Sequence, residues 1–350
     1  MFAKKNLVAA AALLAVAGAA QAQSSVKLYG YVEAGVGSFE AAHTKGAKAR
    51  TTEVTSGKMM TSFIGLSGSE DLGGGLKAEF TLESFLGVDT GLAGGTAYGN
   101  KAGGFWSRGS NVALSGGFGK VALGQYDNPL FTSGYTYNPF GSSMGFSPTM
   151  RHFYYNQAGV GQSVAGLAVD TGFVNSVTYE TPNFAGFTAT AQYSPKESTA
   201  AGSGNSYSVS GSYNAGPLSA TLTYIKSGIA TAYDADEKTI GLGASYDFGV
   251  VKAFGQYTQI KQTSGIANKD KIYQLGVSVP VTDKAAVLAS FGKLSNKATA
   301  TGTKETDTVL SVGYDYALSK RTGVYGVFTN NQHTDKVSGQ TYAVGLKHNF

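Results

Sequence analysis

The sequence predicts an all-β fold, a 16-stranded antiparallel transmembrane β-barrel in which short and long connections alternate. Only 14% of the residues are charged, 21 tyrosines and 19 phenylalanines are present, and the mean hydropathy is −0.08. After the first 22 residues, no apolar run reaches the ~18 residues that a membrane-spanning helix needs. A chain with few charges and no apolar blocks spreads its apolar residues by alternation, which is typical of a membrane barrel.

Residues 1–22 are expected to be a signal peptide. Two early lysines precede an apolar stretch, residues 7–20, and Ala20-Gln21-Ala22 matches an A-x-A cleavage site. The alternative, an N-terminal membrane anchor, is disfavoured because the apolar run is short and ends at that site. Cleavage leaves a predicted barrel domain, residues 23–350, with 25 basic and 22 acidic residues and a net charge of +3. The absence of cysteine excludes a small disulfide-stapled scaffold.

Alternating strands recur along the whole chain. In each, apolar side chains share one face and polar side chains share the other, which is the period-two pattern of a β-strand. Each strand has about ten residues, the length of a tilted strand that crosses a membrane. The clearest examples are residues 26–37, 75–84, 187–194 and 238–248.

Two kinds of connection separate these strands. Short turns rich in turn-forming residues lie at 69–75, 116–120, 181–186, 214–218, 247–250, 280–284 and 317–321. Long polar connections are centred near residues 47, 95, 150, 200, 232, 266, 300 and 334. Fifteen connections join sixteen strands, and eight long with seven short connections place both termini on the short-turn side. The connection at 127–172 is too long for an ordinary surface loop, and its many aromatic residues argue against disorder.

A barrel of this size predicts a water-filled lumen. Lipid cannot pair with backbone groups, so strands at membrane depth must close into a ring. A ring of about sixteen strands encloses an aqueous channel, and the polar strand faces then line water. A soluble antiparallel sandwich is the alternative, but its strands are typically shorter and its connections lack this rhythm.

Several longer motifs occur in a fixed order along the chain. They are SSVKLYGYVEAGVG after the cleavage site, GLSGSEDLGGGLKAEFTLES, VALSGGFGKVALGQYDNP, NSVTYETPNFAGF and the terminal Phe350. Together they resemble the general porins of β-proteobacterial (Burkholderia/Neisseria-like) Gram-negative outer membranes. The resemblance implies a homotrimer with short periplasmic turns and long extracellular loops, and a third loop, residues 127–172, folded inward as a constriction.

The resemblance and the predicted lumen together indicate a function. We expect a passive outer-membrane diffusion channel for small hydrophilic solutes and ions, located in the cell outer membrane after removal of the signal peptide. Its expected partners are further copies of itself, outer-membrane lipid and lipopolysaccharide, and the outer-membrane assembly machinery.

Pore width and the charges around the narrowest point set the selectivity of such a channel. Strict parity would turn Arg108 outward, so it lines the pore only if it lies beyond the membrane band or beside a bulge. By position, the candidate pore-lining and constriction residues are Lys27, Glu33, Lys77, Glu79, Glu83, Arg108, Lys120, Asp127, Arg151 and Asp170.

The early strands depart from the porin pattern in their charges. In relatives an arginine ladder faces an acidic loop, but the third loop of this chain is poor in acids. The positions where relatives often carry arginine hold Phe63, Ser67, Gly109, Ala122 and Gln125. A steep transverse field is therefore not carried over. With a mature charge of +3, we expect weak charge selectivity with a mild anion preference.

The last nine residues, 342–350, form another alternating strand. Tyr342, Val344, Leu346 and Phe350 are expected to face lipid or a neighbouring subunit, and Lys347 to face the lumen. We expect this strand to pair with residues 26–37 and close the barrel. The terminal aromatic residue also resembles the signal that the outer-membrane assembly machinery reads, so Tyr342 and Phe350 are the predicted closure and assembly residues.

The sequence offers no convincing catalytic or metal site. GSSMG, residues 141–145, matches the G-x-S-x-G pattern around Ser143, but the required strand and helix are not evident. The histidines are scattered and have no cysteine partners. We expect no enzyme activity, metal, cofactor or nucleic-acid partner. The alternatives left open are an outer-membrane barrel enzyme and a structural or adhesive barrel plugged by its own loop.

Overall fold

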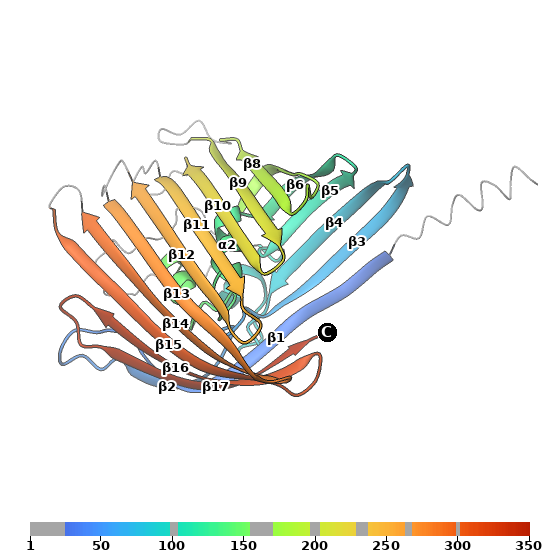
Figure 1. The fold of residues 1–350 in the computed structure, drawn as a ribbon. Coiled ribbons are helices and arrows are strands. Elements are labelled where there is room, and N and C mark those ends of the chain that lie inside the picture. Colours follow the sequence, from blue (N-terminus) through green and yellow to red (C-terminus); the bar gives the residue numbers. More distant parts are fainter. Residues whose placement is uncertain are drawn as a thin grey trace, which may run out of the picture.

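The wall of the molecule is one antiparallel sheet that closes into a barrel, with two short α-helices inside (Figure 1). The computed structural model describes residues 25–98, 104–154, 171–196, 204–228, 237–262, 268–298 and 302–350. The predicted signal peptide lies outside the described residues. Within the described part of the chain, no helix is long and apolar enough to cross a membrane.

Hairpins follow one another around the ring, and each of the seven predicted short turns joins the two strands of one hairpin. The helices are η1 (Gly94–Tyr98, a 3₁₀-helix), α2 (Pro129–Thr136) and α3 (Pro148–Tyr154). The strands are β1 (Ser25–Glu40), β2 (Arg50–Ser56), β3 (Phe63–Gly73), β4 (Leu76–Phe85), β5 (Gly109–Gly116), β6 (Gly119–Asp127), β7 (Gly172–Glu180), β8 (Phe187–Ser194), β9 (Ser206–Ala215), β10 (Leu218–Ser227), β11 (Glu237–Asp247), β12 (Lys252–Gln262), β13 (Asn268–Thr282), β14 (Ala285–Ala298), β15 (Lys304–Ala317), β16 (Thr322–His333) and β17 (Gly339–Asn349).

Two of these segments, β2 and β3, together make a single strand of the wall. Residues 34–40 of β1 pair with β2, and residues 25–31 of β1 pair with β3. The seventeen segments therefore form the sixteen wall strands that the sequence predicts. Between β2 and β3 the segment 57–62 leaves the ladder, beginning at Gly57, whose φ of 72° suits glycine. The sequence pattern did not predict this interruption.

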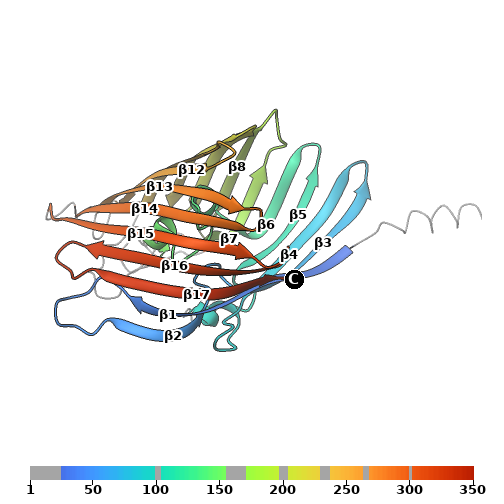
Figure 2. The ribbon, with the colours of Figure 1, turned by 60° about the horizontal axis from the view of Figure 1, so that its bottom comes forward.

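The barrel closes between its first and last strands. β17 pairs with β1 from Asn349 opposite Tyr31 to Tyr342 opposite Ser38, and Figure 2 shows the two strands side by side. The N–H groups of Gly30 and Phe350 donate to each other's carbonyls, at 3.3 and 3.2 Å. The predicted pairing of residues 342–350 with the first strand is therefore confirmed, and it closes the ring of strands.

Side chains on β17 alternate between the two sides of the wall. Outward-facing Tyr342, Val344 and Leu346 are at least half exposed, whereas Lys347 points inward and forms an ion pair with Asp315. An apolar outer face and a polar inner face are what a barrel with lipid outside and water inside requires.

Deletion of Phe350 is expected to lower the yield of assembled barrels without altering the conductance of channels that form. The deletion removes both backbone bonds to Gly30, each worth about 0.5–1.5 kcal/mol, but touches no charge of the lumen. The folded, heat-modifiable fraction on electrophoresis measures the yield, and single-channel recording measures the conductance. A Phe350→Tyr variant keeps the ring and the backbone and is the control. An unchanged folded fraction after deletion would contradict the prediction.

Candidate functional site

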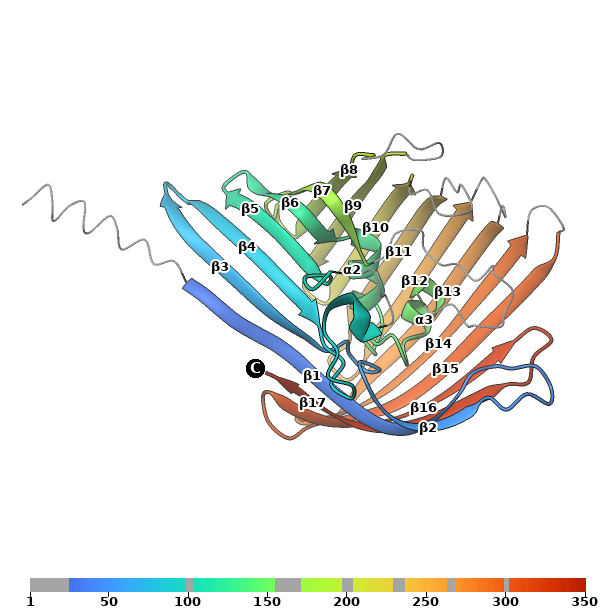
Figure 3. The same ribbon diagram turned by 180° about the vertical axis from the view of Figure 1, so that it is seen from behind.

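The connection between β6 and β7 folds into the lumen. Figures 1 and 3 show α2 and α3 inside the ring of strands, where α2 contacts β9, β10 and β11, and α3 contacts β13, β14 and β15. Asn128 caps α2 by accepting from the N–H groups of Leu130 and Phe131, and Pro129 lies in its first turn. Over its described part, residues 128–154, the third loop is therefore folded inward, as the resemblance implied.

Two apolar clusters hold this loop against the inner wall. Where the loop comes closest, the wall carries glycine: a Cβ at Gly243 would lie only 2.3 Å from Cδ2 of Tyr137. The first cluster joins Leu130 and Phe153 to Phe173, Ile225, Ile260, Ile272 and Leu294, and the second joins Phe140 and Phe146 to Met59, Leu288, Tyr325, Val327 and Ala343. The isoleucines that face the lumen therefore pack against the third loop and do not line the water-filled channel.

Hydrogen bonds from wall side chains fix the position of the loop. Buried polar groups in proteins are mostly paired, and several of those between the loop and the wall are paired with each other. The bonds run from the Thr149 N–H to Oε1 of Gln274 (3.0 Å), from Nε2 of Gln256 to the Gly134 carbonyl (3.1 Å), from the Ser311 hydroxyl to the Phe146 carbonyl (2.7 Å), and between Nε2 of His152 and Oδ1 of Asp307 (3.0 Å).

Glu33 does not face open water, so its predicted place among the water-lining charges is wrong. Its side chain is 1% exposed because the interrupted strand, residues 57–62, folds beside it. Its carboxylate accepts from the Tyr325 hydroxyl and, at 2.9 Å, from the Lys58 N–H. The Lys58 carbonyl in turn accepts from the Ser143 hydroxyl at 2.6 Å and the Gly145 N–H at 3.0 Å. Glu33 therefore links β1, β16 and the third loop.

Ser143, the serine of the G-x-S-x-G match, has a structural role. It is fully buried, and its hydroxyl donates to the Lys58 carbonyl and accepts from the Phe146 N–H at 2.9 Å. A nucleophile needs access to substrate and a neighbouring base, whereas this hydroxyl is enclosed and already bonded. Among the residues that the structure describes, no group of three His, Cys, Asp or Glu side chains could hold a metal ion.

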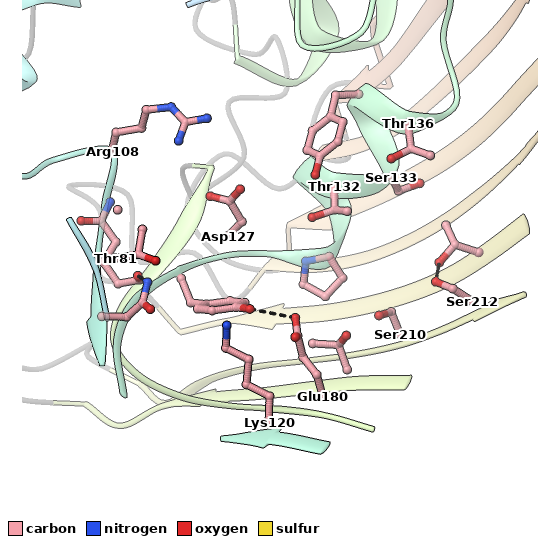
Figure 4. A pocket seen from close by; sticks show the side chains of 18 of the residues that line it. Thr81, Arg108, Lys120, Asp127, Thr132, Ser133, Thr136, Glu180, Ser210 and Ser212 are labelled. Atoms are coloured by element: carbon pink, nitrogen blue, oxygen red, sulfur yellow. Dashed lines mark hydrogen bonds between the residues drawn. The ribbon is translucent and has the colours of Figure 1, made fainter. Parts of the chain in front are cut away.

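A polar cavity of about 560 Å³ lies in the lumen beside α2 (Figure 4). Apart from its charged side chains, the cavity is lined largely by threonine, serine and tyrosine side chains, whose hydroxyl groups are polar. Burial raises the pKa of the Tyr135 hydroxyl on α2, so this phenol is neutral at ordinary pH. The charged side chains that line the cavity are Glu83, Arg108, Lys120, Asp127 and Glu180.

Arg108 is held in this cavity by several partners. Its guanidinium forms an ion pair with Glu83 and lies 4.0 Å from the centre of the Phe63 ring. The Tyr29 hydroxyl donates to the same carboxylate at 2.6 Å. Arg108 directly precedes β5, which begins at Gly109, so the strand parity that would turn it outward does not apply.

Lys120 is also paired, on the neighbouring part of the wall. Its ammonium lies 3.0 Å from the Glu79 carboxylate and 5.8 Å from the centre of the Tyr126 ring. The Tyr126 hydroxyl donates to Glu180 at 3.0 Å. Both cations are thus neutralised by a carboxylate, and the lining as a whole carries one more acidic than basic side chain, so its net field is small.

The remaining predicted site residues lie apart from this cavity. Lys27 and Lys77 are exposed near the short-turn ends of β1 and β4. Arg151 lies on α3, where its guanidinium donates to the Gly145 carbonyl at 2.9 Å, and it lines a separate cavity of about 190 Å³. Asp170 lies outside the described residues. The structure thus brings together Glu79, Glu83, Arg108, Lys120 and Asp127.

Sequence reasoning missed Glu180 and a second luminal cavity. Glu180 shares the inward parity of Ser176 and Thr178 on β7, so the alternation could have revealed it. The second cavity, of about 650 Å³, lies at the short-turn ends of β13–β17, where residues from separate turns meet. Its charged lining residues are Asp283, Lys284, Asp315, Lys320, Arg321 and Lys347.

Comparison with known proteins gives a consistent result. The family described as Gram-negative porin matches residues 9–336. Outer membrane porin protein 32 of Delftia acidovorans is 37% identical, covering 98% of this chain and 95% of that protein. A solved anion-selective porin from Comamonas acidovorans has a TM-score of 0.76 at 31% identity, covering 94% of this chain and all of that one. OmpT of Vibrio cholerae, solved in a trimer form, has a TM-score of 0.66 at 15% identity, covering 93% and 99% of the two chains.

Replacement of Glu33 by alanine is expected to destabilise the barrel and loosen the third loop. The Tyr325 hydroxyl and the Lys58 N–H would lose their buried acceptor, at a cost of about 1–3 kcal/mol for each. The expected results are a lower unfolding temperature by circular dichroism and greater open-channel current noise. Glu33→Gln keeps an acceptor of the same shape and is the control, with a smaller effect. An alanine variant that matches the unmodified protein in both measurements would refute the role of Glu33.

Proposed function

The chain belongs to the Gram-negative porin family, and from that premise we propose how its lumen selects solutes. The protein is an outer-membrane porin, a non-enzymatic β-barrel channel. We propose that small hydrophilic solutes and ions cross it passively, that the third loop sieves them by size, and that anions are mildly favoured. Residues 1–22 would direct export and then be removed.

The proposed weak charge selectivity rests on the ion pairs that the basic side chains form beside the third loop. Three carboxylates and two cations line the cavity at α2, and Arg108 and Lys120 each contact a carboxylate. The paired cations exert little force on a passing ion and the lining is left with a net excess of only one carboxylate, so width rather than charge dominates there. This agrees with the weak field that the sequence predicts.

The second cavity supports the direction of the preference. Four basic side chains and two carboxylates line it, an excess of two positive charges. Screening acts over about 8 Å at physiological ionic strength, so this bias should weaken as salt rises. The Comamonas acidovorans porin, described as anion-selective, supports the same direction.

We further propose that the channel is a homotrimer. OmpT of Vibrio cholerae, an outer membrane protein of the same fold, is described in a trimer form. Within the described residues, β2 pairs only with β1, so its second edge is available to another subunit. The other proposed partners are outer-membrane lipid and lipopolysaccharide around the wall, and the assembly machinery at the terminal strand.

Purified protein in a planar bilayer is expected to give large ohmic current steps in groups of three. In a gradient of KCl, the sign of the reversal potential should show a slight preference for chloride that declines as salt is raised. The same recording separates the alternatives, because a barrel plugged by its own loop would remain silent. Silence would overturn the channel function, and steps that never group would overturn the trimer.

The anion preference should depend on the second cavity rather than on Arg108. The variant Lys284→Gln with Lys320→Gln and Arg321→Gln removes three of its four basic groups, so the chloride-to-potassium permeability ratio should fall to one or below. The matched variant Arg108→Gln with Glu83→Gln removes one charge of each sign and should leave the ratio near its original value. A loss of preference only in the second variant would contradict this assignment.

A further inference from the structure

Six consecutive strands of the wall each carry a lysine within two residues of the end next to the long loops. Each of these residues is the first, second or next-to-last residue of its strand. We refer to them as the lysine row, which consists of Lys226 on β10, Lys238 on β11, Lys261 on β12, Lys269 on β13, Lys297 on β14 and Lys304 on β15.

The lysine row is continuous across the sheet. β10 to β15 lie side by side in the wall (Figure 1), and neighbouring strands are about 4.8 Å apart, so the row extends over about 24 Å. Each lysine stands directly opposite the next in the strand register: Lys226 with Lys238, Lys238 with Lys261, Lys261 with Lys269, Lys269 with Lys297, and Lys297 with Lys304.

All six side chains point away from the lumen. They alternate along their strands with buried, inward-facing residues such as Glu237, Ile260 and Asp270. Lys226 is partly exposed, and the other five are exposed. Within the described part of the chain, no ion pair joins Lys238, Lys261, Lys269, Lys297 or Lys304 to a carboxylate.

Such an arrangement is unfavourable for the isolated protein. Like charges directly opposite each other in an antiparallel sheet repel and destabilise the pairing. Among the described residues at this end of the barrel, the carboxylates Glu237, Asp270 and Asp307 are buried on the other side of the wall, and Glu305 lies 3.9 Å from His333. Among the residues that the structure describes, Lys238, Lys261, Lys269, Lys297 and Lys304 therefore have no carboxylate of the wall to neutralise them, which leaves them able to bind anions outside the barrel.

Outward-facing tyrosines place the lysine row relative to the membrane. The rings of Tyr207 and Tyr224 lie 6.1 Å apart, those of Tyr257 and Tyr273 lie 5.1 Å apart, and Leu275 beyond them is 70% exposed. Tyrosine is enriched at the boundary between lipid and water. The lysines lie two to four residues further toward the loops, which is about 5–9 Å along the membrane normal for strands tilted by ~45°.

We infer that the lysine row binds the phosphate groups of lipopolysaccharide, the phosphorylated glycolipid of the leaflet around the long-loop end of the barrel. This inference rests on the proposed function, because it needs that end to face the outer leaflet. Ammonium groups at headgroup height form charge-assisted hydrogen bonds with phosphate oxygens, and each basic residue near an anionic membrane surface adds attraction. The row lies directly above lipid-facing side chains, so a lipid of the surrounding leaflet reaches it without leaving the membrane.

Binding of lipid A to the purified channel in neutral detergent tests the inference. The probes are bisphosphorylated lipid A and the same lipid without phosphates, and native mass spectrometry measures the copies retained at each concentration. The variant Lys238→Gln with Lys261→Gln and Lys269→Gln removes three adjacent charges, so affinity for bisphosphorylated lipid A should fall about ten-fold or more. The corresponding Lys→Arg variant should retain binding, and the phosphate-free lipid should bind weakly to every variant.

The matched control changes three exposed lysines outside the row, Lys45, Lys48 and Lys196, to glutamine. It has the same change in net charge and should bind lipid A like the unmodified protein. The inference is overturned if the row variant keeps its affinity, if the control loses as much, or if equimolar inorganic phosphate displaces lipid A. The folded fraction and the single-channel conductance are recorded for each variant. A channel that binds lipid A but passes no current would contradict the proposed function while leaving the lysine row assigned.

Discussion

The need to pair backbone groups at membrane depth within the wall itself governs this structure. Lipid offers no hydrogen-bond partners, so a sheet at membrane depth must close. Closure pairs the terminal strand with β1. This pairing extends to the last residue, because the N–H groups of Gly30 and Phe350 donate to each other's carbonyls. The one interruption, between β2 and β3, is tolerated because its backbone groups find partners inside the barrel, in Glu33 and the third loop. The constraint thus determines both where the last strand lies and where the wall can be interrupted.

A closed wall of this width has no core of its own, and the third loop supplies one. Leu130 and Phe146 pack against inward-facing apolar residues of the strands, and wall glycines such as Gly243 make room for the loop. Apolar packing and hydrogen bonds to the strands hold residues 128–154 of the loop against the wall, so this part of the loop forms a partition inside the barrel. Channel width is consequently a property of the fold, and Glu33 contributes to it without facing water.

Features set by local sequence could be predicted, and features set by distant contacts could not. Period-two alternation and turn residues are local, which is why the sixteen strands, the seven hairpin turns and the seam were predicted correctly. Glu33 was placed in water because its burial depends on the interruption at residues 57–62 and on Tyr325, 292 residues away. Arg108 was ambiguous because parity has meaning only inside a strand, and it precedes one. Glu180 followed the parity of β7 and was overlooked rather than unpredictable.

The net charge of the chain is a poor guide to the electric field in the lumen, because some charged side chains face the lumen and others face the outside of the barrel. The mature chain has 25 basic and 22 acidic residues, yet the six of the lysine row point outward and cannot act on an ion in the lumen beyond a screening length. Near that row the carboxylates Glu237, Asp270 and Asp307 are on the inner side. Without the lysine row, the remaining charges favour acids by three, 22 against 19. A net anion preference can therefore arise only from local clusters, which makes the four basic groups of the second cavity decisive for the direction of selectivity.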